Sequence, residues 1–336
     1  MFIINNKNNN KGKNMNNLKK IGLTALAASL VTTSAFAGAL TVSGGASLGV
    51  KNTTGTNDPS TGKGFTMGNQ ITFAGSGELD NGLTVSMSFE LDNGASNGTT
   101  SPFDNHSVTV SSDSLGSLTV HGHGGTNAAS ALDGTAAGDL WDNTLGLVTG
   151  ASGTAMVAAA SGDNLVVYTL PTLADGVAIS VSADTAGANH ETSTAIGLSY
   201  TGVEGLTVSL GKGDDSSTVA VDIEQTTMKA SYAFGPLTIS ASQSDYDHTT
   251  AANDQEVTSY NVAYTVSDAI SISYGMEDLD NNTDTAEVEI TGITASYTSG
   301  GMTISGKSIS ADNVDGSSTG TNNDNEYWKL AASFAF

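Results

Sequence analysis

Hydrophobic and polar residues alternate along most of the chain after residue 37. The clearest case is residues 83–92, where the sequence LTVSMSFELD has an apolar residue at every second position. Because a β-strand points successive side chains to opposite faces, this segment has one face suited to hydrocarbon and one suited to water. Helical spacing of apolar residues is scarce by comparison, so the pattern predicts an all-β fold.

We expect sixteen strands from this pattern. Most have one apolar and one polar face, whereas residues 165–170 are apolar on both. The segment that opens with Val288 and Ile290 changes phase at Gly292, which predicts a β-bulge there. The positions that mark the strands lie within residues 40–51, 71–73, 83–92, 108–110, 118–120, 165–170, 177–181, 196–200, 206–210, 228–234, 237–241, 260–266, 270–276, 288–290, 302–304 and 328–336.

The connections between these segments alternate in length. Long connections rich in Gly, Ser, Thr, Asn and Asp are separated by seven short ones, at residues 80–82, 114–116, 174–176, 203–205, 235–236, 267–269 and 300–301. A sheet in a bilayer must close on itself, because unpaired backbone groups are costly in hydrocarbon, and sixteen strands leave an aqueous channel. We therefore predict a 16-stranded antiparallel transmembrane β-barrel with short periplasmic turns and long external loops.

Residues 1–37 have the features of a signal peptide. Two lysines precede an apolar stretch that is too short to span a bilayer, and residues 35–37 (Ala-Phe-Ala) fit a cleavage site. Residues 1–14 are a possible upstream extension, because Met15 is an alternative start. We expect residues 38–336 to form one barrel domain.

Charge and composition narrow the choice of partners. The chain has no cysteine and no arginine, and after residue 37 six lysines face 34 acidic residues, a formal charge of −28. Nucleic acid is excluded as a partner, because phosphate binding needs a basic surface. An acidic surface attracts cations, although it also simply keeps loops solvated.

The chain resembles the Gram-negative general porins in the sixteen alternating strands, the seven short turns, and a last strand, residues 327–336, that ends in the aromatic Phe336. Its longest loop, at about residues 124–162, also occupies the place of the family's third external loop. The resemblance implies a homotrimer in the cell outer membrane, surrounded by lipid, that passes small hydrophilic solutes. It also implies that Phe336 is part of the signal read by the barrel assembly machinery, and that the long loop narrows the barrel as a constriction loop. Family members set loop acids against wall arginines, which this chain lacks.

The long loop carries Asp133, Asp139 and Asp142 beside Trp141. If the loop enters the barrel, these acids would line the narrowest point and favour cations. The alternative is that they are solvated loop acids.

Strand phase suggests where a basic side of the constriction would lie. Lys51, Lys307 and Lys329 each have the parity opposite to their apolar neighbours, so all three point inward on strands that become adjacent when the barrel closes. A lysine facing lipid would cost about 2–4 kcal/mol at the bilayer midplane, which favours the inward orientation. The alternative is three isolated lysines at different heights near the rim. Lys229 is inward by the same argument.

Five glutamates also have the parity of the lumen, and they outnumber the inward lysines. We expect them to support a preference for cations, weakened by salt. They are Glu78, Glu90, Glu277, Glu287 and Glu289.

Catalysis and metal binding have little support in the sequence. A G-x-S-x-G nucleophile motif is absent, and His121 and His123 on one strand face are too few ligands for a structural metal site. The Asp-rich residues 278–284 could hold a divalent cation but lack the EF-hand pattern. We expect no enzyme activity, no cofactor and no bound metal.

Two other functions stay open. One is a non-transport surface β protein, either an adhesin or a structural barrel, although no short β-helix repeat is present. The other is an outer-membrane hydrolase, which the missing nucleophile motif disfavours.

Overall fold

A computed structural model of the chain describes residues 36–37, 40–55, 62–92, 104–143, 164–184, 192–218, 221–314, 316–317 and 324–336. Apart from the two-residue strand β1 (Phe36–Ala37), the predicted signal peptide lies outside the described residues.

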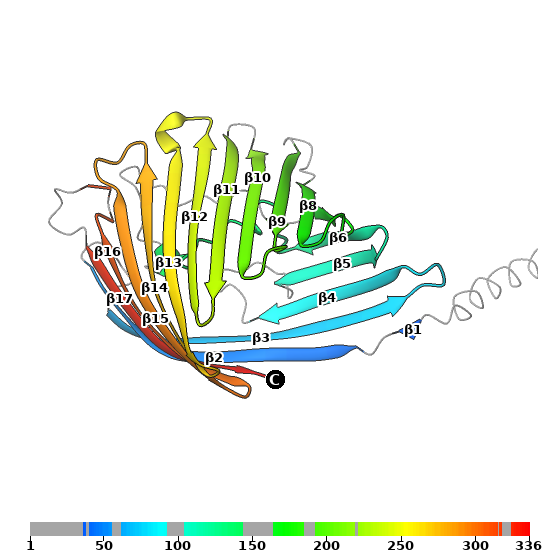
Figure 1. Cartoon of the computed structure of the whole chain (residues 1–336), viewed down its shortest axis with the longest axis horizontal. Coiled ribbons are helices and arrows are strands. Elements are labelled where there is room, and N and C mark those ends of the chain that lie inside the picture. The colour runs from blue at the N-terminus through cyan, green and yellow to red at the C-terminus, as the bar shows by residue number, and fades with distance from the viewer. Residues whose placement is uncertain are drawn as a thin grey trace, which may run out of the picture.

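Sixteen long strands follow one another around the wall in chain order (Figure 1). Every predicted strand is present. Their bounds are β2 (Thr41–Thr54), β3 (Gly62–Glu78), β4 (Thr84–Asp92), β5 (Asn105–Ser112), β6 (Gly116–His123), β7 (Leu165–Thr169), β8 (Val177–Asp184), β9 (Ser193–Tyr200), β10 (Leu206–Thr218), β11 (Val221–Phe234), β12 (Leu237–His248), β13 (Gln255–Ser267), β14 (Ile270–Asn281), β15 (Val288–Ser299), β16 (Met302–Asp312) and β17 (Asn325–Ala335).

The sheet is closed and antiparallel throughout. Each strand from β2 to β16 pairs with the next one, and β17 returns to β2, with Phe334 opposite Ala46. The backbone of Phe336 extends this seam, because its N–H donates to Gly44 O (3.0 Å) and its carbonyl accepts from Gly44 N (2.8 Å). The predicted 16-stranded barrel is therefore confirmed.

The short connections are tight hairpins at one end of the barrel, which we call the turn end; the opposite end is the loop end. In the first hairpin, Gly82 has a φ of 80°, which favours glycine, and its N–H donates to Leu79 O (2.8 Å). The described residues contain two short helical segments, α2 (Leu140–Asn143) and the 3-10 turn η1 (Ala251–Asn253). No helix among the described residues is long and apolar enough to cross a membrane.

Side chains alternate between the two faces of the wall, as the sequence pattern requires. The outer face of the turn-end half is apolar: Val42 on β2 and Ile71 on β3 are 60% and 41% exposed there. The inner face of these strands carries mainly Ser, Thr and Gly, such as Ser43 and Thr72, which lie directly opposite each other. The barrel is thus apolar outside and polar inside over this half.

The loop-end part of β15 has the opposite arrangement, and the predicted bulge at Gly292 is wrong. β15 pairs continuously with β14 and β16 through Gly292. Val288 and Ile290, 1% and 0% exposed, face the interior, whereas Glu289 between them is exposed on the outside. The apparent change of phase is a change in which face is apolar.

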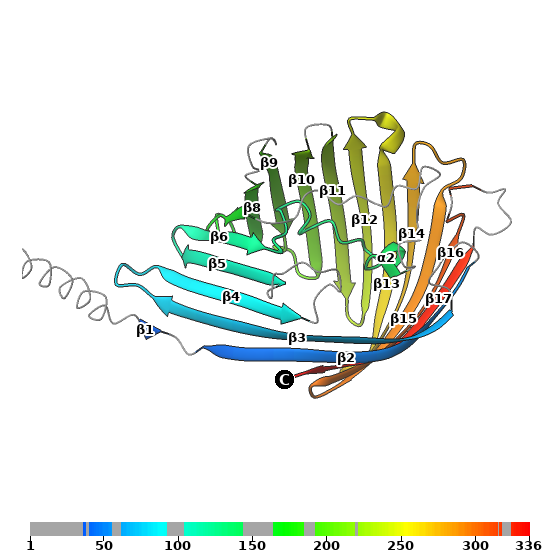
Figure 2. The same cartoon turned by 180° about the vertical axis from the view of Figure 1, so that it is seen from behind.

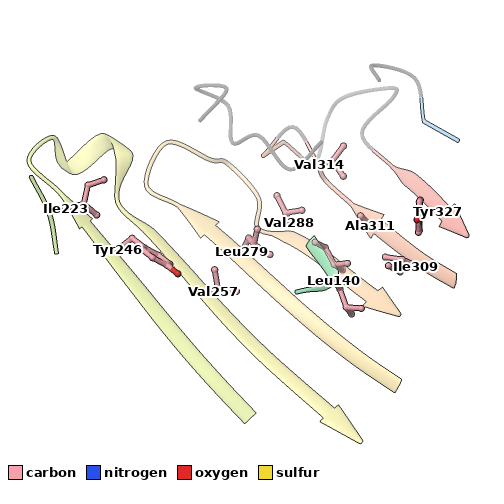
Figure 3. Close-up of a cluster of buried hydrophobic side chains, with 11 residues drawn as sticks. Leu140, Ile223, Tyr246, Val257, Leu279, Val288, Ile309, Ala311, Val314 and Tyr327 are labelled. Carbon is pink, nitrogen blue, oxygen red and sulfur yellow. The ribbon is translucent and has the colours of Figure 1, made fainter. Parts of the chain in front are cut away.

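A cluster of apolar side chains lies on the inner face of strands β11 to β17 at this end (Figure 3). Leu140 from α2 belongs to this cluster together with residues from strands β11 to β17, including Val288 and Ile309. It is the larger of two buried apolar clusters in the described residues, and it lies inside the barrel. The remaining members are Ile223, Tyr246, Val257, Leu279, Ile290, Ala311, Val314 and Tyr327.

Candidate functional site

The long loop after β6 folds back along the inner wall. Figure 2 shows the segment that carries α2 crossing the inner side of the strands around β12 to β14. Three of its backbone N–H groups donate to wall hydroxyls. Ala128 N bonds Ser182 Oγ on β8 (2.9 Å), Ala136 N bonds Ser242 Oγ on β12 (2.8 Å), and Ala137 N bonds Ser259 Oγ on β13 (2.9 Å). Of the predicted loop 124–162, residues 124–143 therefore lie inside the barrel, and the rest is outside the described residues.

Inward-facing glycines make room for this loop. A Cβ on Gly275 would lie 2.5 Å from the Cβ of Ala137, closer than side chains approach each other. A Cβ on Gly292 would lie 2.9 Å from Leu140 Cδ2. The same crowding holds on β9 and β10 for Gly197, Gly211 and Gly213 against Ala128 and Ala129. Sequence reasoning missed these residues, although glycine at inward parity on neighbouring strands was the available signal.

Glu277 fastens the loop to β14. Its carboxylate is fully buried (0% exposed), and it accepts hydrogen bonds from the Thr135 hydroxyl and from Trp141 N (2.9 Å). Lys229 on β11 binds the same loop, because its ammonium donates to the carbonyl oxygens of Gly134 (2.7 Å) and Thr135 (3.1 Å). Both side chains point inward as predicted, but they hold the loop rather than line open water.

Asp133 is tied to the wall through Gln225 on β11. Gln225 is 0% exposed; its Nε2 donates to Asp133 Oδ2 (2.9 Å) and its Oε1 accepts from Ser130 Oγ (3.1 Å). Burial raises the pKa of Asp133 to about 6, the negative charge of Asp139 adds to the rise, and the Gln225 hydrogen bond opposes it. Asp133 is therefore ionised at neutral pH but titrates close to it.

Asp139, the second loop acid, is bonded within its own turn. Asp139 and Thr135 bond reciprocally: Thr135 N donates to Asp139 Oδ1 (2.9 Å), and Asp139 N donates to Thr135 Oγ1 (2.7 Å). Asp139 has a φ of 52°, and this bonding holds the turn in that conformation. The backbone of Asp142 lies in α2, and its side chain is outside the described part of the structure.

The three predicted lysines lie side by side. Lys329 on β17 is directly opposite Lys307 on β16 and directly opposite Lys51 on β2. It faces the interior, because Tyr327 two residues earlier belongs to the interior cluster. Residues directly opposite each other share a face, so all three lysines line the inner wall at one level. The register contradicts the alternative of three lysines at different heights. We call these residues the lysine row.

The remaining predicted lumen acids divide into two groups. Glu90 keeps the inward parity and accepts from Thr72 Oγ1 (3.4 Å), and Glu78 shares a face with Thr84 at the turn end. The inward assignment of Glu289 is wrong, because it lies opposite Asp278 and Asp312 on the outside.

Glu287 precedes β15 and is exposed, and no strand pairing fixes the side that it faces, so its lumen assignment stays a prediction. The assignment of Glu289 failed because alternation shows that two faces differ, not which face is inside.

Metal ligands are not gathered anywhere in the part of the chain that the structure describes: no group of three or more His, Cys, Asp or Glu residues is placed to hold an ion there.

A closed sixteen-stranded barrel with its longest loop fastened inside defines the porin class of membrane channel. The chain matches the profile of the Gram-negative porin family over residues 22–317 and belongs to that family. Members are channels rather than enzymes, and the family and the barrel point to the outer membrane as the location. No curated protein sequence matches the chain significantly.

Solved porin structures share the fold. A porin structure refined at 1.8 Å has a TM-score of 0.64 and 22% identity, and covers 89% of this chain and 100% of its own. A triple mutant of the Rhodopseudomonas blastica porin gives a TM-score of 0.62 at 14% identity with the same coverage. At such identities, these similarities bear on the fold alone.

Proposed function

We propose that the chain forms an outer-membrane pore through which small hydrophilic solutes and ions diffuse passively, with a preference for cations. The observation that carries the proposal is the polar inner wall of a closed barrel, crossed by a loop bonded to that wall at Ser182, Ser242 and Ser259. A wall of hydroxyls and glycines does not form a dry core, so water fills the space that the loop leaves.

Reconstitution into planar bilayers tests the pore. We expect stepwise increases of current that scale with salt concentration. An adhesin or a structural barrel would give no such steps, so silent bilayers seeded with correctly folded protein would overturn the proposal in favour of that alternative.

The cation preference is supported by the charge balance. The chain has 34 acidic residues against 11 basic ones, and Asp133, Asp139 and Asp142 are the candidate acids of the constriction. Replacing all three with Asn should move the reversal potential in a potassium chloride gradient towards zero. Glu289→Gln, which removes one charge from the outer face, is the matched control. If the triple variant keeps the selectivity of the parent, the loop acids lie outside the ion path.

A homotrimer is supported by the uneven outer face. The exposed tyrosines Tyr232, Tyr260, Tyr264, Tyr274 and Tyr297 lie on β11 to β15, whereas β2 to β6 contain none. Tyrosine is typical of the lipid interface, so the β11–β15 side faces lipid in our proposal, and β2–β6, with exposed Phe65 and Met67, contacts partner copies.

The trimer proposal has a direct test. Phe65→Ser with Met67→Ser should convert the detergent-solubilised protein to monomers in sedimentation experiments, while Tyr232→Ser with Tyr260→Ser should leave the trimer intact. Equal behaviour of the two double variants would refute the assignment of sides.

Export and assembly complete the proposal. Residues 1–37 would direct export, and Phe336 would serve the assembly machinery. Phe336 is 75% exposed, which leaves its ring available for recognition. Phe336→Ala should lower the amount of barrel inserted in cells but not the yield of refolding into detergent; a matching loss in both would assign the ring a structural role instead.

A further inference from the structure

The outer face of β14 to β17 is hollowed near the middle of the wall, at a place that we call the outer groove. Its main row consists of direct cross-strand partners on four adjacent strands, in the order Tyr274, Ile293, Ser308 and Trp328. All four side chains are exposed on the outer face. Ser308 is short and stands between Ile293 and Trp328, which leaves a groove of about 360 Å³.

The loop-end side of the outer groove is polar. The next row in this direction pairs Thr291 with Ser310 and Ser310 with Glu326, and all three line the groove. One row further on, Glu289 lies directly opposite Asp312, and both are exposed. The groove therefore opens at this side onto hydroxyl groups and then onto carboxylates.

The turn-end side of the outer groove is apolar. The next row in this direction runs through Ile272, Ala295, Gly306 and Leu330. A Cβ added to Gly306 would have Leu330 Cδ1, at 4.0 Å, as its nearest neighbour, so the space above this glycine is open. The small Ala295 and Gly306 between the exposed Ile272 and Leu330 form a trough that continues the groove towards the turn end. We call this feature the apolar trough.

The electric charge around the outer groove is one-sided. The two lysines of β14 to β17, Lys307 and Lys329, belong to the lysine row on the inner face. The outer face of β3 carries Lys63, opposite Asn52, which is opposite Trp328, so this lysine is two strand spacings or about 10 Å away. The carboxylate of Glu326, by contrast, lines the groove itself. A ligand that fits this charge brings a positive group to the polar side.

We propose that the outer groove holds one zwitterionic phospholipid of the phosphatidylethanolamine type, taken from the surrounding membrane. Its ammonium group lies beside Glu326 and Trp328, because a carboxylate and an indole ring both attract an ammonium group. Its phosphate accepts hydrogen bonds from the hydroxyls of Ser308, Ser310 and Thr291. One acyl chain lies in the apolar trough, where it covers exposed apolar surface.

The order of these features agrees with the position of a lipid in a membrane. Aromatic residues such as Tyr274 and Trp328 are typical of the level where hydrocarbon meets water. The head group then lies on the loop-end side of this level and the acyl chain on the turn-end side. The inference needs this side of the barrel to face lipid, as proposed above, but it does not need the pore to conduct.

Lipid retention measured by native mass spectrometry tests the site. The folded protein is incubated in detergent with an equimolar mixture of phosphatidylethanolamine and phosphatidylglycerol. We expect one phosphatidylethanolamine to be retained for each chain, in preference to the anionic lipid, which Glu326, Glu289 and Asp312 repel. Equal retention of the two lipids, or retention of neither, would overturn the site.

Filling the groove should remove the lipid. Ser308→Leu places a large side chain between Ile293 and Trp328, and retention should fall roughly tenfold. Ala241→Leu is the matched control, because Ala241 is exposed on the outer face of β12, away from the groove. Full retention in Ser308→Leu, or an equal loss in both variants, would contradict the assignment of the lipid to this groove.

A second pair of variants tests the head group without changing the shape of the groove. Glu326→Gln should lower the preference for phosphatidylethanolamine over phosphatidylglycerol roughly fivefold, because it removes the nearest negative charge. Glu256→Gln, which removes a carboxylate from the outer face of β13, should leave the preference unchanged. The proposal fails if Glu326→Gln keeps the preference of the parent, or if both variants lose it equally.

Two further results separate this inference from other accounts. Glycerophosphoethanolamine, which has the head group but no acyl chain, should not be retained; retention equal to that of the intact lipid would assign the groove to a soluble ligand instead. Lipid retention by a barrel that gives no current would overturn the proposed pore and leave the lipid site standing. Current from a barrel that retains no lipid would do the reverse.

Discussion

The carboxylate of Glu277 accepts a hydrogen bond from the hydroxyl of Thr135, 142 positions away in the chain. This contact joins the middle of β14 to the loop that follows β6, and it is buried. A loop that is free to leave the wall would not carry such a contact. The interior of the barrel is therefore shaped by a fixed segment.

Removing this carboxylate should loosen the loop. Glu277→Ala leaves the Thr135 hydroxyl and the Trp141 N–H without their partner, at a cost of about 1–3 kcal/mol for each buried group. We expect faster hydrogen exchange at the amides of Ala136 and Ala137, and noisier single-channel current. Glu90→Ala, which removes an acid from the open wall, is the control. Unchanged exchange in Glu277→Ala would show that other contacts suffice to hold the loop.

The glycines beneath the loop lead to a second prediction. Gly275→Ala places a methyl group 2.5 Å from the Cβ of Ala137, so the loop must move away from the wall into the lumen. Single-channel conductance should fall. Gly306→Ala is the control, because the nearest atom to its added Cβ is Leu330 Cδ1 at 4.0 Å. A conductance equal to that of the parent would mean that the loop does not limit the pore.

Titration of Asp133 gives a prediction on pH. Its pKa is raised from 3.8 to about 6, so the folded loop holds the proton more tightly than the unfolded chain does. The stabilisation of the docked loop from this proton is complete below pH 3.8 and is lost as the pH rises through about 6. The cation preference should weaken as the pH falls from 7 to 5, because Asp133 becomes neutral.

Reversal potentials measured across this range check the prediction. Asp133→Asn should remove the step near pH 6. A step of the same size in the variant would assign the titration to another group.

The barrel itself could be predicted from the sequence. Alternation with period two, together with seven short connections, is a local signal, and the bilayer dictates closure. The seam between β17 and β2 then followed from the strand count. The parity of Lys51, Lys307 and Lys329 was also correct, but their common level depends on register, which alternation does not set.

The loop end could not be predicted in the same way. There the inner face of β14 to β16 is apolar where α2 with Leu140 lies against it, and the outside is polar, as at Glu289. A rule that places the apolar face towards lipid therefore fails for Val288 and Ile290. Leu140 lies far from Val288 and Ile290 in the chain, so no local pattern reveals that they share an interior cluster.

Because the chain has no cysteine, a single introduced thiol reports on one position, and this gives the most direct test of the hydrated lumen. Ser88 and Met87 are neighbours on β4 that face opposite sides of the wall; Ser88 lies opposite Ser107, and Met87 is 44% exposed on the outer face. A charged thiol reagent that does not enter membranes should reduce the current through Ser88→Cys channels and leave Met87→Cys channels unchanged. An unaltered current through Ser88→Cys, or an equal effect on both, would contradict a barrel with water inside and lipid outside.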